Sequence, residues 1–331
     1  MRDTVYPQVE ARRYQCLRCG RTFRVYPQGV TQAQVSQRVR GLAVMLYLLG
    51  LSYGAVSLAL GALGVYMAKS QVYEAVQAAA KRVPDLTRNA VFDGVRTPAM
   101  GSDITSVKCR GQWLPLGLSE DADTLRAWLA PIAEAVGATL LVTDDADAFK
   151  SAAKHLGLDQ QVCKSHVLRN TEALIASLTA ALAQPDESLT AIGVTPQQAL
   201  ADLTRLAELI QTRRPQDESD LEKLHQRYVE APGPRKDEQA SLAYRLRMLF
   251  LDRWNLWRNL TRYRHWHGPH GETVDGTNNA SERAIGWWIK ERYRPMRGYK
   301  RQQSAVNVSR LLAWSGNQLT TGGADLARLI A

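Results

Sequence analysis

Residues 140–163, which read LLVTDDADAFKSAAKHLGLDQQVC, decide the fold. Residues 140–143 form a short apolar run typical of a buried strand, residues 146–156 have helical spacing, and 161–163 is a second short strand. Upstream, residues 103–109 and 113–118 alternate like strands, and residues 123–136 carry a helical apolar stripe. The order strand, strand, helix, strand, helix, strand predicts an α/β core.

The region from residue 167 to residue 270 is predicted to be helical throughout. Helical periods cover 168–183, 196–213, 220–229 and 242–263, and the run Ala-Pro-Gly-Pro at 231–234 interrupts them. Arginines dominate the last of these helices, which favours a polyanionic partner. We interpret Trp254 and Trp257, which are interleaved with the arginines, as core residues rather than base-stacking platforms.

A second informative stretch, residues 277–300, begins Thr-Asn-Asn-Ala-Ser-Glu-Arg and continues with a tryptophan pair and many Arg and Lys residues. Read as a helix, it places Glu282, Ile285 and Ile289 on one face. An unpaired carboxylate on a core-facing stripe is costly, so it needs a partner. Because cationic residues crowd the same segment, we infer that a metal ion is this partner and that a phosphate-binding surface lies beside it.

Three carboxylates are therefore candidate metal ligands: Asp103 on the first predicted strand, Asp144 after the buried strand, and Glu282. Carboxylate oxygens suit Mg²⁺ or Mn²⁺, and a two-ion site can activate both the attacking and the leaving oxygen of a phosphodiester. We prefer Asp144 to Asp145 because it directly follows the strand, whereas Asp145 is expected to cap the next helix. Asp93 is the rival for the first position, but it falls in a Gly- and Pro-containing stretch that is typical of a linker.

Composition sets the class of partner. The chain has 331 residues, a net charge of +10 and a pI near 9.6, and a basic protein favours a polyanion because neutralising phosphates releases counterions. Four cysteines in a chain of this length do not make a disulfide framework, so we expect a reducing, cytoplasmic compartment. The first residues lack the apolar run of a signal peptide.

Residues 41–68 contain no charged residue and are long enough to cross a bilayer. Five glycines divide this run, however, so we interpret it as short helices, with Lys69, Ser70 and Gln71 as an N-terminal cap for the next one. The last two helices are predicted to form a helix-turn-helix. Its second helix, about residues 71–81, would place Gln71 and Tyr73 against DNA in the major groove. A membrane span is the alternative.

Cys16 and Cys19 have the spacing of one knuckle of a zinc ribbon. Structural zinc needs four ligands, and no other Cys or His occurs before Cys109. Three explanations are open: the partner knuckle has been lost, the other ligands come from elsewhere, or the pair holds no metal. We favour the first, which makes the pair a remnant zinc site.

The ordered motifs resemble a known family. Residues 142–149, the set Cys163-Lys-Ser-His166, and residues 277–279 with Glu282 and Arg283 look like the Asp-Asp-Glu transposases of bacterial insertion sequences, in particular those with a Cys-x-x-His signature related to Mutator-like elements. The resemblance covers about residues 10 to 315. It implies a ribonuclease-H-like catalytic core with a helical insertion, and divalent-metal-dependent cutting and strand transfer at terminal inverted repeats.

Under this resemblance, Asp103, Asp144 and Glu282 match the catalytic, metal-binding triad. Cys163 and His166 match the signature pair, for which an architectural role, or simply a buried thiol and a core histidine, is expected. Further DNA-contacting candidates precede and follow the glutamate: Asn278, Asn279, Arg283, Lys290 and Arg292. The asparagines alternatively cap the helix, and the basic residues alternatively form a solvated face. The partners implied are double-stranded DNA, at the repeats and the target, and a second copy in a homodimer.

The expected organisation has five parts: a partial zinc-ribbon-like segment (1–30), a helix-turn-helix region (31–83), the first part of the catalytic core (84–166), a helical insertion (167–270) and the rest of the core with the glutamate helix (271–331). The core departs from the family in one respect. Residues 111–123 have room for one strand rather than a hairpin, so the sheet is predicted to be one strand short. The alternative function is therefore a catalytically degenerate, transposase-derived DNA-binding protein or repressor.

Overall fold

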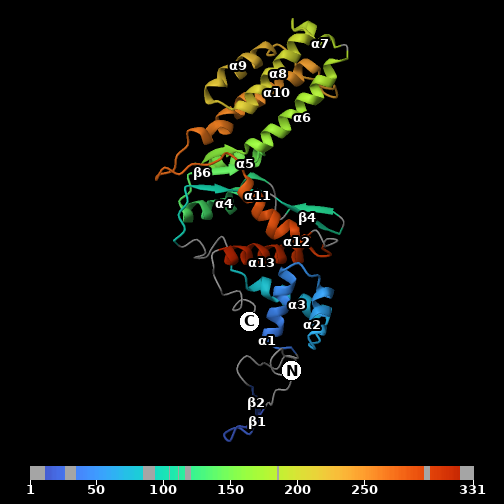
Figure 1. Ribbon diagram of the computed structural model, residues 1–331, viewed down its shortest axis with the longest axis vertical. Helices are drawn as coiled ribbons and strands as arrows, with labels where there is room; N and C mark the ends of the chain where they lie inside the picture. Colours follow the sequence, from blue (N-terminus) through green and yellow to red (C-terminus); the bar gives the residue numbers. More distant parts are fainter. Residues whose placement is uncertain are drawn as a thin grey trace. The chain divides into compact units, whose positions relative to one another are not determined.

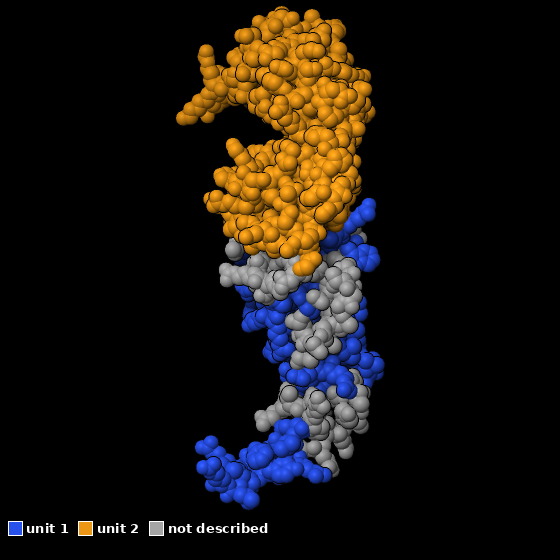
Figure 2. Space-filling model, turned by 90° about the vertical axis from the view of Figure 1, so that its left-hand side faces the viewer, with its two compact units in different colours: residues 1–89, 104–118, 282–331 blue, residues 90–103, 119–281 orange. Residues whose placement is uncertain are grey.

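The structure, a computed structural model, describes residues 12–26, 35–84, 94–103, 105–110, 112–115, 121–184, 186–293 and 299–320. It is a mixed α/β structure, mostly helical, with a small three-stranded parallel sheet. The chain divides into two compact units (Figure 2). Unit 1 comprises Met1–Asn89, Ile104–Leu118 and Glu282–Ala331, and unit 2 comprises Ala90–Asp103 and Ser119–Ser281.

The parallel sheet lies in unit 2 and has the order β3 (Ala99–Gly101), β6 (Leu140–Thr143), β7 (Asp159–Val162). All four residues of the central strand β6 are buried, as expected for an apolar strand covered on both faces. The bounds of β6 confirm the strand predicted at 140–143. The strand predicted at 161–163 begins two residues earlier, because Asp159 already pairs with Leu140 of β6.

Helices α4 (Ala122–Val136) and α5 (Asp147–Leu156) connect these strands and pack against each other (Figure 1). The side chain of Asp121 accepts a hydrogen bond from the backbone N–H of Thr124 and so caps α4. Both helices end at a glycine in the left-handed conformation, Gly137 (φ 71°) and Gly157 (φ 66°), where a side chain would be strained. These local signals explain why both helices agree closely with the sequence prediction.

The two predicted N-terminal strands require a correction. The strand expected at 103–109 begins only at Ser106, and Asp103 precedes it. Strands β4 (Ser106–Cys109) and β5 (Gln112–Pro115) form an antiparallel pair of their own in unit 1, separate from the parallel sheet, and residues 116–118 of the second prediction lie outside the described residues. The edge strand of the parallel sheet is instead β3, at the end of the predicted linker.

The helical region of unit 2 consists of α6 (Lys164–Leu182), α7 (Glu187–Ala191), α8 (Pro196–Thr212), η2 (Pro215–Asp217), α9 (Glu218–Arg227), α10 (Leu242–Thr261) and η3 (Arg262–Arg264). Figure 1 shows α6, α8, α9 and α10 gathered together, and α10 contacts α6, α7, α9 and β7. Trp257 is fully buried in their core and Trp254 packs against it, which confirms the interpretation of both as core residues.

A polar contact ties the helical region to the sheet. The side chain of Gln161, on β7, donates to the backbone carbonyl of Leu260 at 3.1 Å and accepts from the backbone N–H of Tyr263 at 2.7 Å. Gln161 is fully buried, so both ends of its amide satisfy backbone groups where α10 ends. The carboxyl end of α10 is thereby fixed to the sheet that carries Asp144.

Unit 1 contains α1 (Gln37–Leu48), α2 (Tyr53–Ala62), α3 (Lys69–Arg82) and α13 (Gln302–Thr320) around one apolar core, and two strands, β1 (Arg12–Gln15) and β2 (Thr22–Val25), near the start of the chain. The interpretation of the uncharged run 41–68 and the stretch after it as short helices is confirmed, since α1, α2 and α3 have 12, 10 and 14 residues. No helix in the described part of the chain is long and apolar enough to span a membrane. The sequence division grouped α13 with the catalytic core, whereas α13 packs on α3 (Figure 1).

The glutamate segment runs through three helical pieces: α11 (Asn279–Ile285), the π-helical η4 (Gly286–Lys290) and α12 (Glu291–Tyr293). The π-helical turn has more residues per turn than an α-helix, so Ile289 does not continue the face of Glu282 and Ile285 at the predicted spacing. All three side chains are half-buried.

Candidate active site at the carboxyl edge of the parallel sheet

The three parallel strands end side by side, and each is followed by a candidate site residue. Gly101 pairs with Val142, and Thr143 pairs with Val162, so Asp103, Asp144 and Cys163 follow neighbouring strand ends. Backbone hydrogen bonds continue past the strands, from Ser102 N–H to the Val142 carbonyl (2.9 Å) and from Cys163 N–H to the Thr143 carbonyl (2.7 Å). This carboxyl edge of an open parallel sheet is where such folds place ligand-binding residues.

Asp144 is held by its own turn. One carboxylate oxygen, Oδ1, accepts a hydrogen bond from the backbone N–H of Ala146 at 3.1 Å, and the Thr143 hydroxyl donates to the Asp144 carbonyl at 2.8 Å. Thr143 is fully buried and in turn accepts from the side chain of Gln160 at 2.9 Å. The half-buried Asp144 carboxylate therefore has a fixed orientation at the strand end.

Asp145 does not cap α5 as predicted; the N-cap residue of α5, Ala146, has no side-chain cap. The Asp145 carboxylate instead forms ion pairs with Lys150 (Nζ to Oδ1, 2.8 Å) and with Arg253 of α10 (Nη1 to Oδ2, 3.6 Å). The Asp144 side chain forms an Asx turn with the Ala146 N–H directly before the helix, and the Asp145 side chain is directed towards the helical region. Two adjacent aspartates thus have different partners.

Cys163 and Asn278 join two strand ends. The thiol of Cys163 is fully buried, and its Sγ accepts a hydrogen bond from the backbone N–H of Asn278 at 3.3 Å. The Asn278 side chain, 1% exposed, donates through Nδ2 to the Ser102 carbonyl at 2.9 Å. These contacts support the architectural role predicted for Cys163, and they give Asn278 a structural task directly before α11.

Gly101 and Ser281 were missed in the sequence. A Cβ atom at position 101 would collide with the Ser281 hydroxyl and lie 3.1 Å from Asn278 Oδ1, so the first turn of α11 packs directly on the backbone of β3. A glycine at position 101 leaves room for the Ser281 hydroxyl in this position. The glycine in the run Met-Gly-Ser before Asp103 was the available signal, but its partner lies 180 residues away along the chain, which local pattern does not reveal.

His166 and Glu282 lie on two different helices, α6 and α11. His166 lies in the first turn of α6, which begins directly after Cys163, and is half-buried. Glu282 follows Ser281 in α11 and is the first residue of the last segment of unit 1, whereas Asp103 and Asp144 belong to unit 2. Within unit 2, the structure brings together the strand ends that carry Asp103 and Asp144. The place of Glu282 in the triad stays a prediction.

The predicted DNA-contacting residues fall into two groups. Arg283 and Lys290 are exposed, as a phosphate-binding role requires, and Asn279 is partly buried at the start of α11. Arg292 is 4% exposed, and its guanidinium donates to the Leu51 carbonyl at 2.9 Å. Its charge also lies 4.0 Å from the centre of the Tyr47 ring. The prediction of a DNA contact for Arg292 is therefore wrong, because its guanidinium is buried in unit 1 and already has partners there.

Gln71 and Tyr73 also have internal partners. The helix α3 begins at Lys69 rather than Val72, with Ala68 as its N-cap residue, and the side chain of Gln71 accepts from the Ala68 N–H at 3.0 Å. The Tyr73 hydroxyl lies 2.8 Å from that of Ser304 on α13. Both side chains are half-buried, so the predicted recognition helix directs these two residues largely into unit 1.

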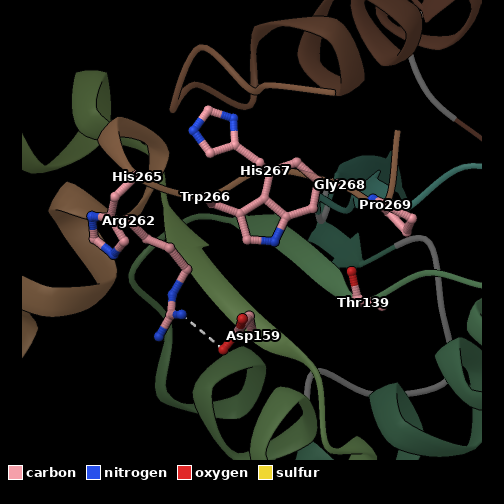
Figure 3. A pocket seen from close by; sticks show the side chains of 8 residues that line it. All are labelled: Thr139, Asp159, Arg262, His265, Trp266, His267, Gly268 and Pro269. Atoms are coloured by element: carbon pink, nitrogen blue, oxygen red, sulfur yellow. Dashed lines mark ion pairs between the residues drawn. The ribbon is translucent and has the colours of Figure 1, made fainter. Parts of the chain in front are cut away.

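A separate pocket of about 510 Å³ lies at the opposite, amino-terminal edge of the sheet (Figure 3). It is lined by Thr139, Asp159, Arg262, His265, Trp266, His267, Gly268 and Pro269. Arg262 and Asp159, which both line the pocket, form an ion pair with Nη1 2.8 Å from Oδ1. None of the predicted site residues lines this pocket.

Comparison with models of known protein families and with curated protein sequences gives no match for the chain. The assignment of a function therefore depends on the site itself.

Proposed function

We propose that the chain is a DNA transposase of the Asp-Asp-Glu type with a ribonuclease-H-like catalytic core. The observation that carries the proposal is the position of Asp103 and Asp144 after neighbouring parallel strands, β3 and β6. The resemblance of the ordered motifs supplies the third ligand, Glu282, one residue beyond Ser281, which packs on Gly101. The net charge of +10 favours the DNA substrate.

The donor set fits the divalent cations that this chemistry requires. Asp144 uses one carboxylate oxygen for the Ala146 N–H and leaves the other for a ligand, while the paired Asp145 is engaged by Lys150 and Arg253. Oxygen ligands of this kind suit Mg²⁺ or Mn²⁺. When bound, such ions supply Lewis-acid stabilisation of the attacking and leaving oxygens of a phosphodiester.

The chain's own residues contribute position and charge. The Asx turn of Asp144 and the hydrogen bonds of Asn278 hold the strand ends in place, so that the carboxylates need not reorganise during reaction. The exposed Arg283 and Lys290 would bind DNA phosphates near the glutamate helix. The overall reaction hydrolyses one phosphodiester at an element end; the freed 3′-hydroxyl then attacks a target phosphodiester, and the 3′-oxygen of the target strand leaves as its bond to phosphorus breaks.

The proposal is tested by incubating labelled DNA that carries the flanking terminal repeat with Mg²⁺ or Mn²⁺. We expect nicking by the wild type and none by Asp144→Asn or Glu282→Ala, with DNA binding retained. Asp147→Asn is the matched control, since it removes a neighbouring carboxylate that is 98% exposed without touching the proposed ligands or the ion pair of Asp145 with Arg253. Equal nicking by the Asp144→Asn and wild-type proteins would refute the triad.

A second function, a catalytically degenerate DNA-binding protein, is favoured by one observation. Each strand of the parallel sheet has three or four residues, and β4 and β5 pair separately from it. A repressor of this kind binds the repeat DNA and cleaves nothing with either cation. The same assay therefore distinguishes the two functions.

A further inference from the structure

The segment that holds Cys16 and Cys19 is a tight β-hairpin. Strands β1 and β2 pair antiparallel from Arg12↔Val25 to Gln15↔Thr22, and both cysteines lie in the connecting turn. Cys16 closes the turn through its N–H, which donates to the Arg21 carbonyl at 2.8 Å, and through its carbonyl, which accepts from Gly20 N–H at 2.8 Å. Gly20 has φ +69°, which lets the chain reverse directly after Cys19.

The turn holds the two cysteine side chains close together. Backbone N–H groups of Cys19 and Arg18 donate to the Cys16 sulfur, and the Cys19 thiol lies within hydrogen-bonding distance of it. Neither cysteine forms a disulfide, Cys19 is exposed and Cys16 is partly exposed. Two thiol groups therefore face solvent from one turn, with the Cys-x-x-Cys spacing that zinc sites use.

Apart from Cys16 and Cys19, the first 108 residues of the sequence contain no Cys or His. The third cysteine of unit 1, Cys109, is 4% exposed within the core of the helices. Cys163 is fully buried against Asn278, and all six histidines belong to unit 2. A structural zinc ion needs four protein ligands, and a second copy of this turn would supply the two thiolates that one copy lacks.

The hairpin also presents an apolar face that it does not bury. Tyr14 and Phe23 are cross-strand neighbours whose rings stack 5.8 Å apart, yet they are 45% and 52% exposed. Val25 is 49% exposed and Leu17 wholly so. A two-stranded hairpin is at best marginally stable in water, so this one gains from a partner that covers its aromatic pair.

We propose that two copies of the chain join through a zinc ion bound by Cys16 and Cys19 of each copy. A second copy is the partner that matches both observations, because it supplies two further thiolates from an identical turn and an identical apolar face. Contact around a two-fold axis is self-complementary, so each copy completes the half-site of the other. The bridge would unite two copies whether or not the chain cleaves DNA.

The test measures zinc content and molar mass of the full chain, purified with zinc present. We expect about one zinc ion per two chains, as four cysteines make one tetrahedral site. Cobalt substitution should give the intense sulfur-to-cobalt absorption of a tetrathiolate. The double variant Cys16→Ser/Cys19→Ser should lose the zinc while its helical circular dichroism is unchanged, since the hairpin is exposed. Cys109→Ala is the matched thiol control and should keep the zinc.

One zinc ion per monomer would overturn the bridge, because the other ligands would then come from the same chain. A protein without zinc would overturn it as well. A cobalt spectrum with only two sulfur ligands would do the same, even in a dimer. In the Cys109→Ala protein only Cys16, Cys19 and the buried Cys163 remain. A spectrum with four sulfur ligands from this protein therefore requires cysteines from two chains.

Discussion

Arg253 and Asp145 form an ion pair across the boundary between the helical region and the parallel sheet, with Nη1 3.6 Å from Oδ2. The side chain of Arg253 is 8% exposed, and its Nε donates to the Thr171 hydroxyl at 2.9 Å. Burial lowers the pKa of Arg253, and the charge of Asp145 opposes this effect. The pair thus joins α10 to the loop that carries Asp144.

We predict that Arg253→Leu lowers the free energy of unfolding by about 2 kcal/mol. Breaking a buried ion pair costs roughly 3–5 kcal/mol. The smaller loss is expected here because Asp145 keeps Lys150 as a partner and remains a quarter exposed. The measurement is urea unfolding of the full chain. The matched control is Arg245→Leu, on the exposed side of the same helix, which should change stability by less than about 0.5 kcal/mol. Equal effects of the two substitutions would contradict a role for the pair.

Gly101→Ala is predicted to destabilise the protein by about 1–3 kcal/mol, the usual cost of overpacking. The added methyl group would collide with the Ser281 hydroxyl, so either the Ser281 side chain must rotate or α11 must shift away from β3. Adding Ser281→Ala should restore part of the loss, which a double-mutant cycle of unfolding free energies would detect. Gly61→Ala is the control, because nothing lies within 4 Å of its added methyl group. No recovery in the double variant would show that Ser281 is not the obstacle.

The sequence predicted best what local pattern determines. The apolar run of β6 and the glycines that end α4 and α5 allowed the bounds of these elements to be predicted to within a residue or two. The three residues of β3 are too few to show an alternating pattern. Their strand conformation is stabilised by pairing with β6. The contact of Gly101 with Ser281 and the burial of Arg292 depend on residues far away in the chain. Tertiary packing alone decides them.

For Arg292→Leu we predict a stability loss of about 2–3 kcal/mol and no change in the salt dependence of DNA binding. Removing the guanidinium leaves the Leu51 carbonyl without its 2.9 Å donor and removes the contact with the Tyr47 ring. Lys290→Ala is the converse control: its exposed charge should leave stability unchanged and reduce the salt slope of binding by about one. Urea unfolding and DNA titration at several salt concentrations measure the two effects. A lower salt slope in Arg292→Leu would support the DNA contact that the sequence predicted for Arg292.

His225 gives a prediction for pH. It is 7% exposed, it packs on Trp254 with ring centres 5.6 Å apart, and neither ring nitrogen has a hydrogen-bond partner among the described residues. Burial, and secondarily the charge of Arg247, lowers the pKa of His225. A histidine with a depressed folded-state pKa contributes its full stability above the unfolded-state value of about 6.5 and loses it as the pH falls.

We therefore expect stability to decline below about pH 6.5, with a slope of up to about 1.4 kcal/mol per pH unit from this residue. His225→Phe should flatten that decline, because an apolar ring of similar size keeps the contact with Trp254 and takes up no proton. His265→Gln, at an exposed histidine, should leave the decline as it is. Urea unfolding between pH 5 and pH 8 measures all three proteins. If His225→Phe declines as steeply as the wild type, the acid sensitivity comes from another group.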